Sequence, residues 1–144
     1  MVAQPASVLI TADEFDLLPE PGDGSRLELV DGEVVQMMTV TWEHGELQAE
    51  IASRLREFVR AHKLGGVTVE TGFRLHRREG EAHIVRSPDV AFVARDRLPP
   101  PEERSRGSLC VAPDLAVEIV SPEERDAVLQ RKVANYLAAG VRRT

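Results

Sequence analysis

The segment from Ala112 to Val141 constrains the fold of this chain more than any other segment. Leu115 to Val120 is almost wholly apolar and alternates little, which is typical of a strand that is covered on both faces. Ser121-Pro122-Glu123-Glu124 then offers an N-cap, a proline at the first helical position and a capping glutamate, and we expect the helix to run to Gly140. Because a helix that directly follows a strand usually packs back across it, this segment predicts a sheet with helical cover.

The segments before it predict further strands and helices around the same core. A capping box at 11–14 opens a short helix that stops before Pro19, and Asp31-Gly32 favours a tight hairpin turn. The other expected elements are hairpin strands at 26–30 and 33–37, a helix at 42–63 ended by Gly65-Gly66, strands at 67–75, 84–85 and 90–93, and a surface loop at 95–108. This order predicts an α/β (α+β) fold in which helices flank a mixed central sheet.

Size and composition predict one soluble domain spanning 1–144. The chain has 144 residues, of which 42% are hydrophobic, and this is enough for one core. No signal peptide or membrane-spanning run is recognisable, so we expect a cytoplasmic protein with no membrane partner. One cysteine and four scattered histidines lack the ligand spacing of a zinc site. The net charge of −6 argues against a surface that is basic throughout, although a local basic groove is compatible with it.

In the segment from Ala112 to Val141, two charged residues occupy positions where apolar side chains are expected. Glu118 lies at the centre of the strand, where a carboxylate needs a cation, a hydrogen-bond network or a metal to offset its desolvation. Lys132 falls inside the apolar stripe of the helix, between Val128 and Tyr136, so it points toward the sheet and could reach Glu118. A solvated strand end or an arginine partner for Glu118, and snorkelling of Lys132 to water, are the simpler alternatives.

A second carboxylate completes a candidate metal site. Asp114 shares a strand with Glu118 and lies roughly 13 Å away at the rise of an extended chain, which is too far to share one ion. Asp89 begins a different strand, so strand pairing can bring it beside Glu118, where both carboxylates could bind Mg²⁺. Such an ion activates a water and offsets charge on a phosphate, while Lys132 orients or deprotonates the water or steadies the phosphate. The natural reaction of this set is hydrolysis of a phosphodiester.

Basic side chains offer a second candidate for contact with nucleic acid. They are Arg54, Arg56, Arg60 and His62 in the long helix, and Arg74, Arg77, Arg78 and Arg86 in the segment after it. Because glutamates interleave with them, an ordinary solvated face is the alternative.

Several motifs resemble those of the Uma2 family of bacterial endonucleases, a branch of the PD-(D/E)XK restriction-nuclease superfamily. They are RLELVDGEVVQM (26–37), His44 opening the long helix, RSPDVAFV (86–93), APDLAVEIVSP (112–122), and Lys132 with NYLAAGV (135–141). The resemblance implies a restriction-endonuclease-like fold and a Mg²⁺-dependent endonuclease acting on DNA, with Mn²⁺ as a substitute ion. It implies catalytic roles for Asp89, Glu118 and Lys132, the first two as metal ligands. Lys132 would replace a lysine that the superfamily motif places at Val120, and Glu28 and His44 would be accessory residues.

The chain differs from the family pattern at its C-terminal end. Family members typically continue into further strands after AGV, whereas three residues follow Val141 here. We therefore expect a C-terminally shortened sheet whose exposed edge a second copy could cover in a homodimer. This difference also supports the main alternative, a catalytically inactive nuclease-fold module that binds nucleic acid or protein. Hydrolysis of another phosphate ester at the same site is a third reading.

Overall fold

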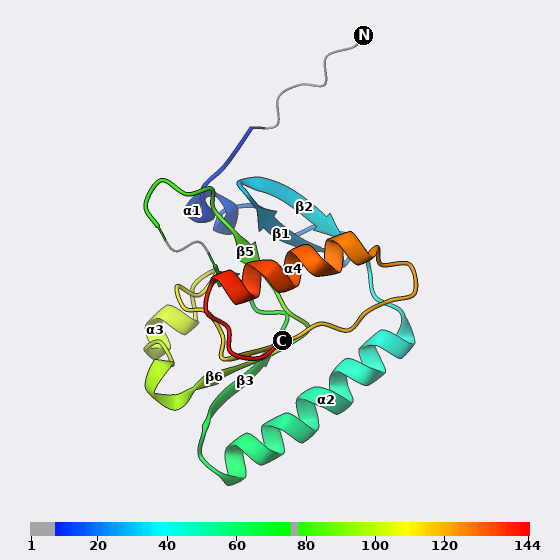
Figure 1. The fold of residues 1–144 in the computed structure, drawn as a ribbon, viewed down its shortest axis with the longest axis vertical. Helices are drawn as coiled ribbons and strands as arrows, with labels where there is room; N and C mark the ends of the chain where they lie inside the picture. The colour runs from blue at the N-terminus through cyan, green and yellow to red at the C-terminus, as the bar shows by residue number, and fades with distance from the viewer. Residues whose placement is uncertain (1–7, 76–77) are drawn as a thin grey trace.

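Two antiparallel sheets form the centre of the molecule in this computed structural model, which describes residues 8–75 and 78–144 (Figure 1). The strands are β1 Arg26–Val30, β2 Glu33–Met37, β3 Gly65–Val69, β4 Phe73–Arg74, β5 Val85–Arg86, β6 Val90–Ala94 and β7 Leu115–Val117. The four-stranded sheet has the order β2-β1-β5-β4, and the three-stranded sheet has the order β3-β6-β7. The expected α+β class is therefore confirmed, but the named strands form two antiparallel sheets instead of the one mixed sheet expected from the sequence.

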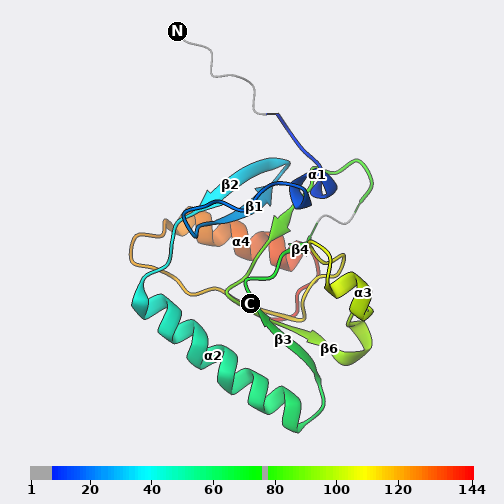
Figure 2. The same ribbon diagram turned by 180° about the vertical axis from the view of Figure 1, so that it is seen from behind.

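Four α-helices surround the sheets in the described part of the chain: α1 Ala12–Asp16, α2 Trp42–Ala61, α3 Pro101–Arg104 and α4 Asp126–Ala138. Helix α2 lies alongside β3 and β6, and α4 crosses beside the four-stranded sheet (Figures 1 and 2). The larger core cluster joins Tyr136 of α4 to Phe73 of β4, Val93 of β6 and Ala116 of β7. Helix α4 thus closes the core where the two sheets approach each other.

The hairpin between β1 and β2 forms as expected from its turn residues. Asp31 and Gly32 adopt φ values of 50° and 81°, the left-handed conformations that a two-residue hairpin turn needs. The register places Leu29 opposite Val34. Leu29 is fully buried while Val34 is exposed, so the inner strand β1 carries the core side chains of this hairpin.

The expected strand at 67–75 and the expected helix end at Gly65-Gly66 are both wrong in detail. Helix α2 ends at Ala61, and Gly65 already opens β3 with a φ of 154°. The extended chain then breaks at Glu70, which has a φ of 54°, so that β3 and β4 belong to different sheets. The spacing of apolar residues does not reveal a single left-handed residue. For this reason it predicts one strand at 67–75 where the structure has two.

The turn between β7 and α4 also differs from expectation. Strand β7 stops at Val117, and α4 begins at Asp126 instead of Pro122. The segment between them contains a turn in which the N–H of Glu124 donates to the carbonyl of Ser121. The side chain of Glu124 binds Lys132 instead of capping the helix, which explains the late start of α4.

The surface segment 95–108 contains a 3-10 helix, Arg95–Arg97, and helix α3, so it is more ordered than a plain loop. Beyond α4, Arg143 lies along the outer edge of β7. Its carbonyl accepts from the N–H of Ala116 and its N–H donates to the carbonyl of Asp114. No helix among the described residues is long and apolar enough to cross a membrane.

Candidate active site

Asp89 and Glu118 meet at one end of the three-stranded sheet. Antiparallel pairing of β6 with β7 sets Val90 opposite Val117. Asp89 directly precedes Val90 and Glu118 directly follows Val117, so both residues leave adjacent strands at the same end. Oδ2 of Asp89 accepts a hydrogen bond from the backbone N–H of Ile119 at 2.6 Å, which ties the two strand ends together. Strand pairing thus brings the two carboxylates to one place, as expected from the sequence.

The carboxylate of Asp89 is buried, with 2% of the residue exposed, and is surrounded by polar partners. Nε2 of His44 lies 3.0 Å from Oδ1, and the guanidinium of Arg26 donates to the same oxygen at 3.3 Å. Thr41 caps α2 and places His44 in its first turn. One turn later, the amide of Gln48 donates to the carbonyl oxygen of Asp89 at 2.9 Å. The start of α2 therefore fixes both the side chain and the backbone of Asp89, and it brings His44 into the site.

Lys132 points inward from α4, and only 5% of the residue is exposed. Its Nζ donates to Glu124 at 3.0 Å and lies 3.5 Å from Oε2 of Glu118. The other oxygen of Glu118 accepts a hydrogen bond from the hydroxyl of Tyr136, which is fully buried, at 2.5 Å. Lys132 therefore does not snorkel to water, and Glu118 has a lysine and a tyrosine as partners instead of an arginine.

Burial is the largest influence on the pKa values of Glu118, Lys132 and Tyr136. It raises the pKa of Glu118 to about 7, and the negative charges of Asp89 and Glu28 act in the same direction, while Lys132 and Tyr136 offset part of the effect. Burial alone would lower the pKa of Lys132, but the neighbouring carboxylates, Glu118 first, outweigh it and hold that pKa above its ordinary value. Lys132 is therefore an ammonium ion across the neutral range. The pKa of the Tyr136 hydroxyl is raised by burial and by Glu118, so it stays a donor.

Glu28 lies close to the site, but its oxygens already have partners. Oε2 accepts from Arg86 at 2.7 Å and Oε1 accepts from the backbone N–H of Ser87 at 2.9 Å. Arg86 also donates twice to the side chain of Asn135, and this links β1, β5 and α4. Both oxygens of Glu28 are thus used by structural partners, and this favours a supporting role for this residue over direct contact with a metal ion or water.

Three residues of the site were not identified as site residues from the sequence. In the sequence, Tyr136 belongs to the apolar stripe of the last helix, Glu124 to the cap of that helix and Arg26 to a hairpin strand. None of these patterns indicates a site residue. Each reaches the site through tertiary contacts with Glu118, Lys132 or Asp89, for which a single sequence carries no local signal.

Asp114 takes no part in this site, as expected. Its oxygens accept from the backbone N–H of Ala94 at 2.8 Å and from the guanidinium of Arg97 at 2.6 Å. It is therefore a buried anchor between β6 and the segment that leads into β7.

The basic side chains of the two central segments do not form one phosphate-facing patch. Arg86 is buried against Glu28, and Arg74 binds Asp13 and Asp16 at 2.8 and 2.7 Å. Arg54 is exposed and pairs with Glu50 on its own helix. Arg77 lies outside the described residues. Arg86 and Arg74, two of the arginines proposed for phosphate contact, are therefore engaged with carboxylates of the protein itself.

The residues of this site fit a divalent ion that takes only a few of its ligands from the protein. Among the described residues, no group of three or more histidine, cysteine or acidic side chains is arranged to enclose a metal. Asp89 and Glu118 nevertheless offer two carboxylates at one place. The pKa of Glu118 is raised chiefly by burial, and a divalent ion bound there would favour its charged form. Mg²⁺ usually keeps several waters and is bound through one or two carboxylates together with substrate phosphates. Two carboxylates therefore suffice for this ion.

Known proteins that are similar to this chain indicate its family and its reaction class. No curated protein matches the chain. A solved structure described as a "putative nuclease belonging to DUF820", from Anabaena variabilis, is similar with a TM-score of 0.69 and 25% sequence identity, over 89% of this chain and 68% of that one. The family model described as "Putative restriction endonuclease", Uma2, matches residues 12–144. Both findings support a nuclease, a hydrolase that acts on nucleic acid. The chain belongs to the Uma2 family.

Proposed function

We propose that this protein is a Mg²⁺-dependent endonuclease that hydrolyses phosphodiester bonds in DNA, with Asp89, Glu118 and Lys132 as its catalytic residues. The observation that carries the proposal is the meeting of Asp89 and Glu118 at one end of β6 and β7, with Nζ of Lys132 3.5 Å from Glu118. Membership of the Uma2 family supports the reaction class. We further propose that the protein acts in the cytoplasm and that its substrate is DNA.

Asp89 and Glu118 would hold the ion, and Mn²⁺ would replace Mg²⁺ with the same oxygen ligands. A divalent ion bound there polarises the phosphodiester and lowers the pKa of a coordinated water. The chain itself holds the two carboxylates in place, through the N–H of Ile119 on Asp89 and the hydroxyl of Tyr136 on Glu118. Preorganised ligands of this kind need no rearrangement when the substrate arrives.

Lys132 supplies positive charge and does not remove a proton. Because its pKa lies above the ordinary value, it has no proton-accepting form near neutral pH. It orients the attacking water or stabilises the negative charge that develops on the phosphate. His44 binds Asp89 at 3.0 Å and acts as a positioning residue for that carboxylate.

Cleavage of plasmid DNA tests the proposal directly. The wild type should cut plasmid in Mg²⁺ or Mn²⁺ and should lose activity with a chelator. Asp89→Asn and Glu118→Gln should each lower the rate by at least about a hundredfold, because each removes a negative ligand of the ion. Glu50→Gln removes an exposed carboxylate of α2 and should leave the rate unchanged. Undiminished cleavage by Glu118→Gln would show that the site is assigned wrongly.

The competing function is a nuclease fold without catalysis that binds nucleic acid or protein. Thermal unfolding separates the two, because an ion bound only by the folded state raises the melting temperature with its concentration. The nuclease should be stabilised by millimolar Mg²⁺, and Glu118→Gln should lose this response. A wild type with no such shift would favour the non-catalytic module.

A further inference from the structure

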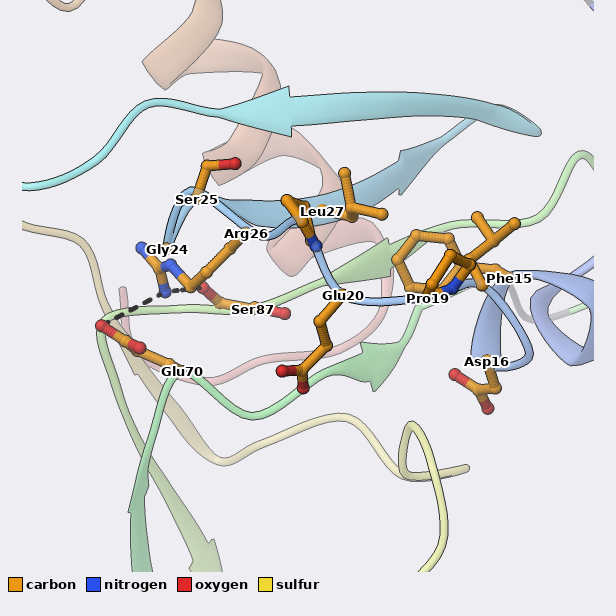
Figure 3. A pocket seen from close by; sticks show the side chains of 12 residues that line it. Phe15, Asp16, Pro19, Glu20, Gly24, Ser25, Arg26, Leu27, Glu70 and Ser87 are labelled. Atoms are coloured by element: carbon orange, nitrogen blue, oxygen red, sulfur yellow. Dashed lines mark hydrogen bonds and ion pairs between the residues drawn. The ribbon is translucent and has the colours of Figure 1, made fainter.

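A pocket of about 430 Å³ opens beside the candidate active site, and the reaction proposed above does not use it (Figure 3). Its volume is within the range of small-ligand pockets. Its wall includes Phe15, Pro19, Glu20, Arg26, Glu70 and Ser87, and we term it the Arg26 pocket. Arg26 belongs both to this wall and to the surroundings of Asp89, so the pocket and the candidate active site share one side chain.

Arg26 is held loosely in comparison with other arginines of the core. Its guanidinium lies 3.3 Å from Asp89, 3.4 Å from the carbonyl of Ser87 and 3.9 Å from Glu70. The corresponding contacts of Arg86 are 2.7 to 3.0 Å. The side chain of Arg26 is also 22% exposed, against 4% for Arg86. A guanidinium has five N–H donors, and long contacts of this kind leave it free to rearrange at small cost.

Arg26 occupies the oxygen of Asp89 that a metal ion would need. It shares Oδ1 with His44, whose Nε2 lies 3.0 Å away, while Oδ2 already accepts the short bond from Ile119. Of these partners of Oδ1, Arg26 is the one that carries a permanent positive charge. A divalent ion bound by Asp89 would compete with the guanidinium for Oδ1 and repel it. The wall of the Arg26 pocket is where this side chain already lies, so the displaced guanidinium would enter the pocket.

The pocket has a guanidinium at one end and apolar rings at the other, although three carboxylates, those of Asp16, Glu20 and Glu70, also line it. At one end, Arg26 lies next to Glu70 and Ser87 (Figure 3). At the other end are the rings of Phe15 and Pro19 and the carboxylate of Asp16, and the carboxylate of Glu20 lies between the two ends. Apolar rings can pack against the face of a base, and a guanidinium binds phosphate through two parallel hydrogen bonds.

We propose that the Arg26 pocket binds one nucleotide of the substrate strand, next to the phosphodiester that is cut. Arg26, displaced from Asp89 by the metal ion, binds the phosphate of this nucleotide, and its base lies against Phe15 and Pro19. This inference rests on the proposed nuclease function. Arg26 then has two opposite effects: it weakens metal binding by competing for Asp89, and it strengthens the binding of nucleic acid.

Two binding measurements on Arg26→Met test the inference without any cleavage. Mn²⁺ binding is measured by electron paramagnetic resonance, and binding of a fluorescent DNA duplex is measured by anisotropy in Ca²⁺. The variant should bind Mn²⁺ at least about threefold more tightly, because a competing cation is gone. It should bind DNA about tenfold more weakly, because one phosphate contact is lost. Arg26→Gln should behave in the same way, and both variants should still unfold cooperatively.

Arg131→Met is the matched control, since Arg131 is an arginine that pairs with Asp31 at the far end of β1. It should change neither affinity. Unchanged or weaker Mn²⁺ binding by both Arg26 variants, or unchanged DNA binding, would overturn the inference while leaving the nuclease proposal intact. A wild type that binds neither Mn²⁺ nor DNA would instead refute the proposed function, and the inference with it.

Discussion

Glu118 should give the protein a stability that falls as the pH rises toward neutrality. Burial raises the pKa of this carboxyl from 4.5 to about 7, so the folded state binds more protons than the unfolded state between these two values. The free energy of unfolding must decrease over this interval, and the contribution of the neutral carboxyl is fully present only below 4.5. A shift of this size corresponds to on the order of 3 kcal/mol.

Urea unfolding of the wild type and of Glu118→Gln measures this contribution, since the other titrating groups are common to both. The wild type should lose stability relative to the variant between pH 4.5 and pH 7. A difference between the two proteins that does not change with pH would show that Glu118 titrates normally.

Removal of Lys132 should destabilise the fold as well as stop cleavage. Lys132→Met leaves the partly exposed carboxylates of Glu118 and Glu124 without the buried cation that they share, and breaking such a pair costs up to about 3 kcal/mol. The double variant Lys132→Met with Glu118→Gln should recover part of this loss in urea unfolding, because one uncompensated charge is removed. A double variant that is less stable than Lys132→Met alone would contradict this account of the pair.

At the scale of elements, the β3–β6 pairing depends on the absence of a side chain at Gly65. Its φ is 154°, and a Cβ atom there would lie 2.1 Å from the carbonyl oxygen of Val93. Gly65→Ala should therefore lower the free energy of unfolding by about 2 kcal/mol or more. Gly45 is the matched control, because it lies in α2 and, apart from its chain neighbours and the backbone of its own helix, no atom lies within 4 Å of its Cβ position. Gly45→Ala should raise stability by up to about 1 kcal/mol.

Both effects can be read from thermal or urea unfolding. If Gly65→Ala and Gly45→Ala changed the free energy of unfolding equally, the close contact at Gly65 would not be what makes glycine necessary there.

Elements whose signals are local could be predicted from the sequence. Asp31-Gly32 determined the β1–β2 hairpin, and apolar spacing found α2 and α4 to within a turn or so. It could not find the break at Glu70, because one residue with positive φ leaves the apolar pattern unchanged. It also placed the start of α4 too early, because the turn residues Ser121 to Glu124 have the composition of a helix cap, and a tertiary bond to Lys132 uses Glu124 differently.

At the scale of the whole molecule, the candidate site is assembled from parts that no local pattern connects. Asp89 and Glu118 could be paired in advance because each flanks a strand, and Lys132 because it interrupts an apolar stripe. Tyr136 fits the apolar stripe of α4 without exception, so its bond to Glu118 could not be anticipated. The position of Arg26 over Asp89 depends on how β1 of one sheet lies against the end of β6 in the other, and the sequence does not encode this arrangement locally.

The central claim is that the fold makes two distant carboxylates share one divalent ion. Crystals of the wild-type protein soaked in millimolar Mn²⁺ test it most directly, through anomalous scattering recorded near the manganese absorption edge. The account predicts one strong anomalous peak in contact with carboxylate oxygens of both Asp89 and Glu118, and its loss in Glu118→Gln. A peak bound elsewhere, or no peak at a site that is accessible in the crystal, would contradict it.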